Sequence, residues 1–386
     1  MLRMKKICTA FLTIALCTHV LAHDDTEMKD PNRVSQEQRE RKVEYGTYTV
    51  PPRNQDNGMF RLKRDVDPPC TNCVITVMSA NLEYSNGTTA DAENGMWLHH
   101  ILFYNKANRD DICGEKKPGQ RFFGSGNDRT PLDLTDGGKN KLGYHIGHND
   151  QFFISVELMN MHFSSQDVVL TAHWKFVEEP YSEYELGTPY WFDVASCGRS
   201  DVPATNNAIF NFISPPVRLD FHGQLAYLSN HVHDGAYLHE VKKNGKIICS
   251  VNPQYSSDDG ADGIVHLSHV PPCSNAGPVA PGDEVSLTAS YDTTKYAPMI
   301  NEDGTLEPVM GVTLAYIVKG TAPVASDSGG RFYFVVPIAA IAFIALTIGA
   351  GYVFYSARQK KEWPKWLSRR QKYQSVGTED EAFLAR

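Results

Sequence analysis

Histidines at close spacing are the residues of this chain that could bind a redox metal. His231 and His233 stand two positions apart, directly before Asp234 and Gly235. On a β-strand, alternate side chains share a face, about 6.6 Å apart at ~3.3 Å per residue, so two imidazoles at this spacing can chelate one ion. The Asp-Gly turn signal puts the pair near a strand end, where a coordination position can stay open. Two unconnected surface or core histidines would give the same pattern.

A second group of histidines lies in two apolar stretches. His99 and His100 are adjacent within the run from Gly95 to Tyr104. Neighbouring side chains of a regular strand face opposite sides, so ligation by both rings requires a local twist or a bulge. Both rings need partners, because burying an unpaired polar group is costly. His162 ends another strand-like run and can supply a third ring, although alone it would be assigned a structural role.

Met310 lies at the start of the last strand-like run of the central region. By itself it would be assigned to the core. Two histidines and one methionine combine imidazole with a soft thioether, which favours copper, particularly Cu(I), over zinc, calcium or magnesium. His231, His233 and Met310 are therefore predicted to form a copper site.

The order His-His, His, His-x-His and Met resembles the ligand order of the copper type II, ascorbate-dependent monooxygenases. These include peptidylglycine α-hydroxylating monooxygenase and dopamine β-hydroxylase. Four blocks are still more similar to the stress up-regulated nodulin family of plants and fungi: Pro69–Cys73, Trp97–His100, His231–Gly235 and Tyr291–Tyr296. The resemblance covers about residues 70–318.

This resemblance implies an all-β fold of two tandem antiparallel, jelly-roll-like β-sandwich domains with two copper ions, one in each domain. The first site would store and pass an electron, and its ligands match His99, His100 and His162. The second would bind O₂ and hydroxylate a substrate C–H bond with electrons from ascorbate. Its ligands match His231, His233 and Met310.

Two positions depart from the peptide-amidating enzyme. Where that enzyme holds its substrate carboxylate with an arginine and a tyrosine, this chain has Ser229 and Leu314. The expected substrate is an unknown small molecule or peptide other than peptidylglycine. The missing anchors leave open a non-catalytic copper-binding or stress-related cell-surface protein. A third alternative is a histidine-brace oxygenase, in which cleavage after Ala22 would make His23 the N-terminal copper ligand.

The segments that must position these side chains read as short β-strands. Runs rich in β-branched and aromatic residues, such as Cys73–Met78 and Val312–Val318, recur between turn signals. Asn244-Gly245 predicts a hairpin turn. An acidic stretch at 178–185 is predicted to separate a first copper domain, residues 45–180, from a second, residues 181–319.

The two ends of the chain predict its compartment. Residues 1–22 have the charged start, apolar run and small-residue end of a signal peptide, and the polar segment 23–44 is predicted to be disordered. After a linker at 320–331, residues 332–355 carry no charge. At ~1.5 Å per residue they extend about 36 Å, enough to cross a bilayer of ~30 Å as a transmembrane helix.

Basic residues directly after this span predict a cytosolic tail, residues 356–386, and hence a single-pass type I membrane protein of the secretory pathway. The expected location is the plasma membrane or an endosomal or vacuolar membrane. A net charge of -8 without a basic stripe excludes a nucleic-acid partner.

The cysteines agree with an oxidising compartment. Six of the eight lie beyond the predicted signal peptide, at Cys70, Cys73, Cys113, Cys197, Cys249 and Cys273. An even number in a secreted chain predicts disulfides, and Cys249–Cys273 is the expected pair within the second domain. Asn86-Gly-Thr88 predicts N-glycosylation at Asn86.

Overall fold

The computed structural model describes residues 37–198, 200–301 and 303–320, and this part of the chain is all-β. Its helical pieces are three short 3-10 turns, η1 (Asp56–Gly58), η2 (Ala92–Asn94) and η3 (Gly114–Lys116). The predicted signal peptide, linker, span and tail lie outside the described residues, apart from Gly320.

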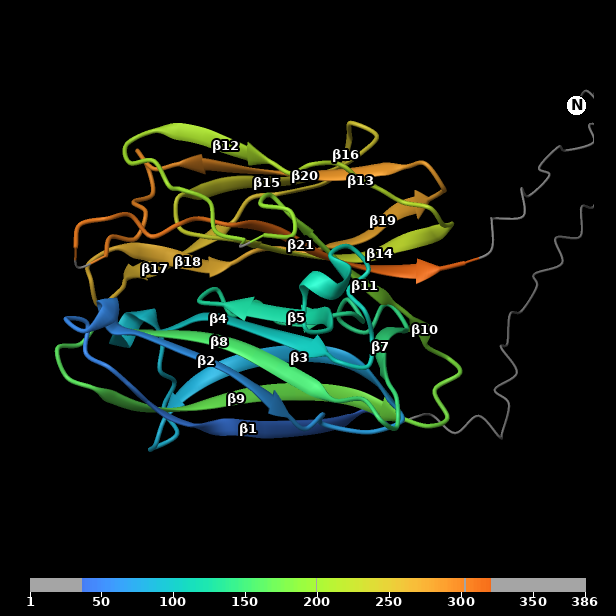
Figure 1. Ribbon diagram of the computed structural model, residues 1–386, viewed down its shortest axis with the longest axis horizontal. Coiled ribbons are helices and arrows are strands. Elements are labelled where there is room, and N and C mark those ends of the chain that lie inside the picture. Colours follow the sequence, from blue (N-terminus) through green and yellow to red (C-terminus); the bar gives the residue numbers. More distant parts are fainter. Residues whose placement is uncertain (1–36, 199, 302, 321–386) are drawn as a thin grey trace, which may run out of the picture. The chain divides into compact units, whose positions relative to one another are not determined.

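Two sheets come mainly from the first half of the chain (Figure 1). One has the order β1 (Arg39–Val50), β9 (Gln166–Glu178), β3 (Cys73–Tyr84), β7 (Leu142–Ile146) and β10 (Glu185–Leu186), with β6 (Leu132–Asp133) beside β3. The other has the order β2 (Met59–Val66), β8 (Phe152–Asn160), β4 (Met96–Asn105) and β5 (Gln120–Gly126).

The second half contributes two further sheets and a hairpin. One sheet has the order β11 (Thr188–Asp193), β21 (Gly311–Lys319), β14 (Gly223–Val232) and β19 (Cys273–Val279). The other has the order β12 (Ile209–Ile213), β20 (Glu284–Asp292), β15 (Ala236–Lys243) and β16 (Lys246–Val251), with β13 (Val217–Arg218) on β20. The hairpin pairs β17 (Gln254–Asp259) with β18 (Val265–His269).

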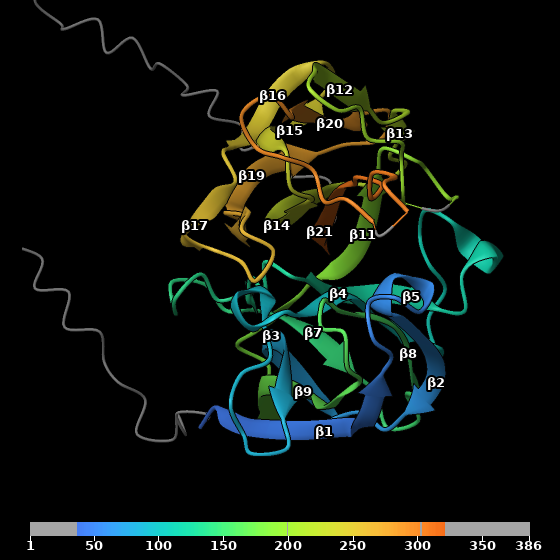
Figure 2. The ribbon, with the colours of Figure 1, turned by 90° about the vertical axis from the view of Figure 1, so that its left-hand side faces the viewer.

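The predicted fold class, two tandem antiparallel sandwich domains plus a C-terminal transmembrane helix, must be corrected. The described residues form one compact unit of four larger sheets that lie one above another (Figure 2). One apolar core crosses the expected boundary, since Trp191, Tyr227 and Tyr316 pack with buried residues of the first half. The strands are not all antiparallel either, because β7 and β10 pair in parallel.

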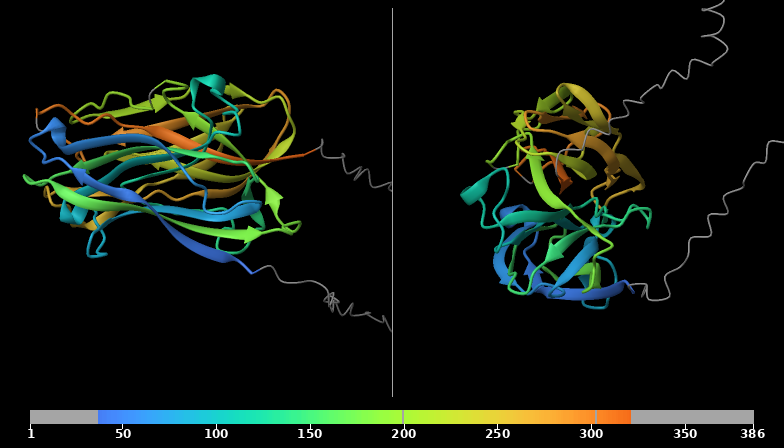
Figure 3. Two further views of the ribbon diagram at one scale, coloured as in Figure 1. Left: turned by 60° about the horizontal axis from the view of Figure 1, so that its bottom comes forward. Right: turned by 90° about the vertical axis from the view of Figure 1, so that its right-hand side faces the viewer.

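The predicted two-domain fold fails because strands between the two halves are buried on both of their faces. Strands β11 and β21 are buried along almost their whole length, so the alternating pattern of a one-faced domain is missing. Long strands of both halves also run in roughly the same direction (Figure 3).

As for the transmembrane helix, residues 332–355 are not described, and the described part contains no helix long and apolar enough to cross a bilayer. The division near residue 180 stays a prediction.

Strand β1 begins at Arg39, inside the segment 23–44 that was predicted to be disordered. Its charged side chains are mostly exposed, which explains the prediction. Its backbone nevertheless pairs with β9, and its charges pair across the sheet, Arg39 with Glu178 and Lys42 with Glu83. Backbone pairing therefore orders a stretch whose side chains alone predict disorder.

Three disulfides join the six cysteines: Cys70–Cys73, Cys113–Cys197 and Cys249–Cys273. The predicted Cys249–Cys273 pair is confirmed. Cys113–Cys197 links positions 84 residues apart and ties the loop after β4 to the loop after β11. Asn86, the predicted glycosylation site, lies exposed in the turn after β3.

Candidate metal centre

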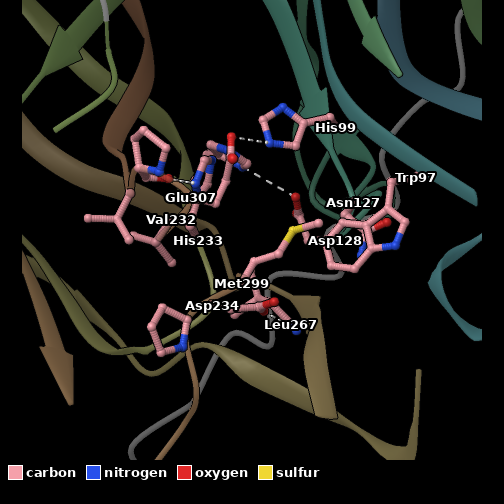
Figure 4. A pocket seen from close by; sticks show the side chains of 14 residues that line it. Trp97, His99, Asn127, Asp128, Val232, His233, Asp234, Leu267, Met299 and Glu307 are labelled. Carbon is pink, nitrogen blue, oxygen red and sulfur yellow. Dashed lines mark hydrogen bonds and ion pairs between the residues drawn. The ribbon is translucent and has the colours of Figure 1, made fainter. Parts of the chain in front are cut away.

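Four histidines from two distant parts of the chain meet in one cluster, the histidine cluster, made of His99, His100, His231 and His233. The ring centroids of His100 lie 5.0 Å from His233 and 5.5 Å from His231. His99 lies 4.3 Å from His100 and 5.8 Å from His233. Figure 4 shows His99 and His233 from the two halves facing the same space.

Strand β4 presents two adjacent rings because its pairing is irregular. The register of β4 against β8 shifts between Leu98 and His100. A bulge of this kind inserts an extra residue and rotates the side chains that follow it. The predicted local distortion at His99-His100 is therefore confirmed, and both rings reach the cluster.

Strand β14 carries the other two rings at its end. His231 is still paired with Val312 of β21, whereas His233 follows the last strand residue. Gly235 has φ +95°, a left-handed conformation that turns the chain away directly after the pair. The glycine at position 126 also permits close approach, because a Cβ there would lie 2.6 Å from Cε1 of His231.

Three of the rings have one nitrogen held by an acceptor. Nδ1 of His233 lies 2.7 Å from the carbonyl oxygen of Pro308, and Nδ1 of His231 lies 3.3 Å from Oδ1 of Asp128. Nδ1 of His100 lies 3.5 Å from Oε2 of Glu157. A neutral imidazole that donates from Nδ1 keeps its lone pair on Nε2, so these acceptors select the tautomer that a metal needs.

The free nitrogens converge. One ring nitrogen from each of His100, His231 and His233 lies within 4.8 Å of the others. Nε2 of His231 is buried without a hydrogen-bond partner among the described residues, and Nε2 of His100 lies 2.9 Å from Nε2 of His233. With both Nδ1 atoms donating, two lone pairs face each other, and a shared cation would remove this repulsion. The donor set therefore fits a metal, and three imidazoles suit copper.

The charge states of the rings also favour metal binding. Burial and the neighbouring His99 lower the pKa of His100 to about 3. Burial and the adjacent imidazoles hold the pKa of His233 well below its usual value. Both rings are therefore neutral at pH 7 and can donate a lone pair.

His99 differs from the other three rings. Its Nδ1 lies 3.4 Å from Glu157 and its Nε2 lies 3.2 Å from Glu307. Burial opposes the charged form, but hydrogen bonds and charge from the two carboxylates outweigh it and raise the pKa of His99 to about 9. The two carboxylates thus favour the protonated ring of His99. Only after losing a proton could His99 join His100 and Glu157 as a second group of possible metal ligands.

The remaining two predicted ligands lie elsewhere. Nε2 of His162 donates to the carbonyl oxygen of Asn94 at 2.7 Å, and the ring stands against Gly95 instead of joining the histidine cluster. Met310 lines a cavity together with His99, His100 and His231, and its carbonyl accepts a hydrogen bond from Tyr291. The structure thus brings together four of the five histidines across the two predicted sites, with Met310 beside them.

Three carboxylates at the centre, Asp128, Glu157 and Glu307, were not found by sequence reasoning. Glu157 had a usable signal, because it is the one acid in the apolar run of β8 (Phe152–Asn160). Asp128 and Glu307 lie in irregular segments after β5 and before β21, where no periodicity marks them.

Asp128 is predicted to position His231. Replacing Asp128 with alanine would remove the acceptor that orients the ring, and loss of such an outer-shell partner typically lowers metal affinity ~10–100-fold. Competition of the purified protein with a chromophoric Cu(I) chelator measures the change. Asp167→Ala, which removes an exposed carboxylate that pairs with Thr49 on β1, is the control and should leave the affinity unchanged. Equal affinities for Asp128→Ala and the wild type would contradict the assignment.

No family model matches the chain. The chain is 92% identical over 309 residues to the "Probable copper-dependent oxygenase clz3" of Cochliobolus lunatus, and the alignment covers 80% of this chain and 100% of that relative. The chain therefore belongs to the same family of copper-dependent oxygenases.

Two solved structures show a distant likeness. PNGF-II has a TM-score of 0.39 and 10% identity, over 72% of this chain and 66% of that one. A peptide-N(4)-(N-acetyl-beta-D-glucosaminyl) asparagine amidase has a TM-score of 0.38 and 12% identity, over 74% of this chain and 97% of that one. At these values the likeness says nothing about the activity of this chain.

Proposed function

We propose that the chain is a copper-dependent monooxygenase that hydroxylates a C–H bond of a substrate other than peptidylglycine, with ascorbate as the reductant. One oxygen atom of O₂ enters the C–H bond and the other leaves as water. Ascorbate supplies the two electrons and two protons that this balance requires. The observation that carries the proposal is the convergence of ring nitrogens from His100, His231 and His233, with each second nitrogen held by an acceptor.

Each group of the centre has a distinct role. His100, His231 and His233 would bind copper, and Met310 would add a thioether that favours its reduced state. Asp128 and the Pro308 carbonyl orient two of the rings. Bound copper would supply the one-electron chemistry that activates O₂.

The number of copper ions remains part of the proposal. The resemblance implies two ions in separate sites, one of them involving His162. The described geometry favours a first ion at His100, His231 and His233, and offers His99, His100 and Glu157 as the second group. Because His100 belongs to both groups, two ions would have to lie close together or share it.

We also propose that the chain is a protein of the secretory pathway, with the copper centre on the lumenal or extracellular side. Three disulfides support an oxidising compartment, since disulfides are rare in the cytosol. The exposed Asn86 sequon is compatible with this side of the membrane.

Oxygen consumption by the purified, copper-loaded full chain tests the proposed function. We expect ascorbate-dependent O₂ uptake by the wild type and its loss in His231→Ala. His173→Ala removes an exposed histidine of β9 and should behave as the wild type. Stoichiometric copper with equal O₂ uptake in all three proteins would refute the assignment of the centre. Bound copper with no uptake would favour a non-catalytic copper-binding protein.

A further inference from the structure

A cavity with a mostly apolar wall opens beside the histidine cluster. His99, His231 and His233 form one side of it. Trp97, Leu267 and Met299 form an apolar part of its wall (Figure 4). A concave and mostly apolar surface of this kind is typical of sites that bind small organic molecules.

The apolar wall is held in place from several parts of the chain. Trp97 of β4 packs edge-to-face on His266, with ring centroids 4.4 Å apart. His266 is itself fixed by Asp234 at 2.7 Å and Asp262 at 2.9 Å. Met299 is 6% exposed and packs in one apolar cluster with Trp97. The cavity is therefore a preformed surface and not a gap between mobile side chains.

The carboxylates of the wall are already engaged. Asp128 contacts His231, Asp234 accepts from the backbone of Leu267 and contacts His266, and Glu307 contacts His99. Among the described residues, the wall carries no lysine or arginine and its three carboxylates already hold the nearby histidines, so a carboxylate ligand would find no free cation there and would lose its hydration.

Besides nitrogens of the histidine rings, one polar atom of the wall has no hydrogen-bond partner among the described residues. Oδ1 of Asn127 is buried and makes no hydrogen bond with the described residues, although Asn127 lines the cavity. A buried acceptor without a donor costs free energy, which a ligand hydroxyl could recover. Apart from the histidine rings, the wall therefore offers an apolar surface and one unpaired hydrogen-bond acceptor.

A second cavity meets the same histidines but differs in character. It is lined by His100 and Met310 and also by Arg61 and Lys63. Glu157 and Glu307 line it as well, so its lining is of mixed charge and more polar than that of the first cavity. Such a lining suits water and charged solutes better than a hydrocarbon. The apolar cavity is thus the better place for the C–H bond that is to be oxidised.

We propose that the cavity of Trp97, Asn127 and Met299 binds the substrate, and that the part it takes is an uncharged aromatic or aliphatic group with one hydroxyl donor for Asn127. This assignment rests on the copper-dependent oxygenation proposed above. It narrows the unknown substrate to molecules that can present a neutral, apolar segment beside His231 and His233.

Ligand binding to the metal-free full chain tests this inference separately from the copper chemistry. Isothermal titration calorimetry after removal of metal would compare 4-phenyl-1-butanol with 4-phenylbutyrate. We expect the alcohol to bind at least about tenfold more tightly, because the carboxylate loses hydration next to three acids. Equal affinities, or no binding of the alcohol, would overturn the inference. Failure of the oxygenase proposal would instead appear as absent copper binding or O₂ uptake.

Variants locate the binding. Met299→Trp fills the cavity and should weaken alcohol binding at least about tenfold. Met161→Trp, in the same methionine-rich cluster but off the cavity wall, should bind as the wild type. Asn127→Ala removes the acceptor without adding bulk and should weaken alcohol binding about fivefold, as expected for one hydrogen bond. Circular dichroism checks that each variant folds, and unchanged binding in a folded Met299→Trp or Asn127→Ala would contradict the assignment.

Discussion

His233→Ala is expected to lower copper affinity by at least about 100-fold, more than the ~10–100-fold that loss of an outer-shell partner costs. His233 contributes the nitrogen that lies 2.9 Å from Nε2 of His100, so it connects the two halves of the cluster. Its Nδ1 is held by Pro308, which means that the ring is oriented before metal arrives. Without it, one of the three converging ring nitrogens is lost, and only His100 and His231 remain of the group.

A competition titration with a chromophoric Cu(I) chelator measures this loss. His173→Ala is the matched control, because it removes an exposed imidazole of β9 outside the cluster. The variant would be compared with the wild type at the same pH and salt. An affinity for His233→Ala within about threefold of the wild type would be incompatible with a centre built on this ring.

Asp110→Ala is expected to lower the free energy of unfolding by ~3–5 kcal/mol, the usual cost of breaking a buried ion pair from one side. Asp110 is 3% exposed and Arg121 is 2% exposed, with 2.7 Å between Oδ2 and Nε. Removing the carboxylate leaves a guanidinium buried under the ring of Trp191. The effect would reach the metal centre, since Arg121 belongs to β5, which leads to Asp128.

Urea unfolding followed by circular dichroism measures the change. Asp65→Ala, which breaks an exposed pair with Lys106, serves as the control and should cost less than ~1 kcal/mol. Similar losses in both variants would show that Arg121 finds another partner.

The same pair has a defined pH dependence. Burial would raise the pKa of Asp110, but the hydrogen bonds and charge of Arg121 outweigh it and lower the pKa below its usual value. A carboxyl with a lowered pKa stabilises the folded state above its unfolded pKa, and this contribution is lost as the pH falls through the folded value. The difference between the wild type and Asp110→Asn should therefore shrink below about pH 4.

Several features of the site could be predicted because they are local. The spacing of His231 and His233 on β14 needs only the period of a strand, and the adjacent His99 and His100 needed a distortion that the register shift provides. The Cys249–Cys273 pair also followed from position along the chain. The outer carboxylates could not be predicted in this way, because Asp128 and Glu307 lie in irregular segments.

The sequence by itself determined the kind of chemistry and the kind of structure. Imidazole and thioether donors select copper through their own electronic character, and β-branched and aromatic runs select strands, whatever the rest of the chain does. The tertiary structure alone decided which donors meet. His100 and His233 are 133 positions apart and come within 2.9 Å because the sheets of β4 and β14 pack through one core, while His162, closer in sequence to His100, is held by Asn94 instead. Contacts between residues so far apart in sequence depend on which sheets pack against the two faces of a buried strand. No local sequence pattern specifies these packing partners.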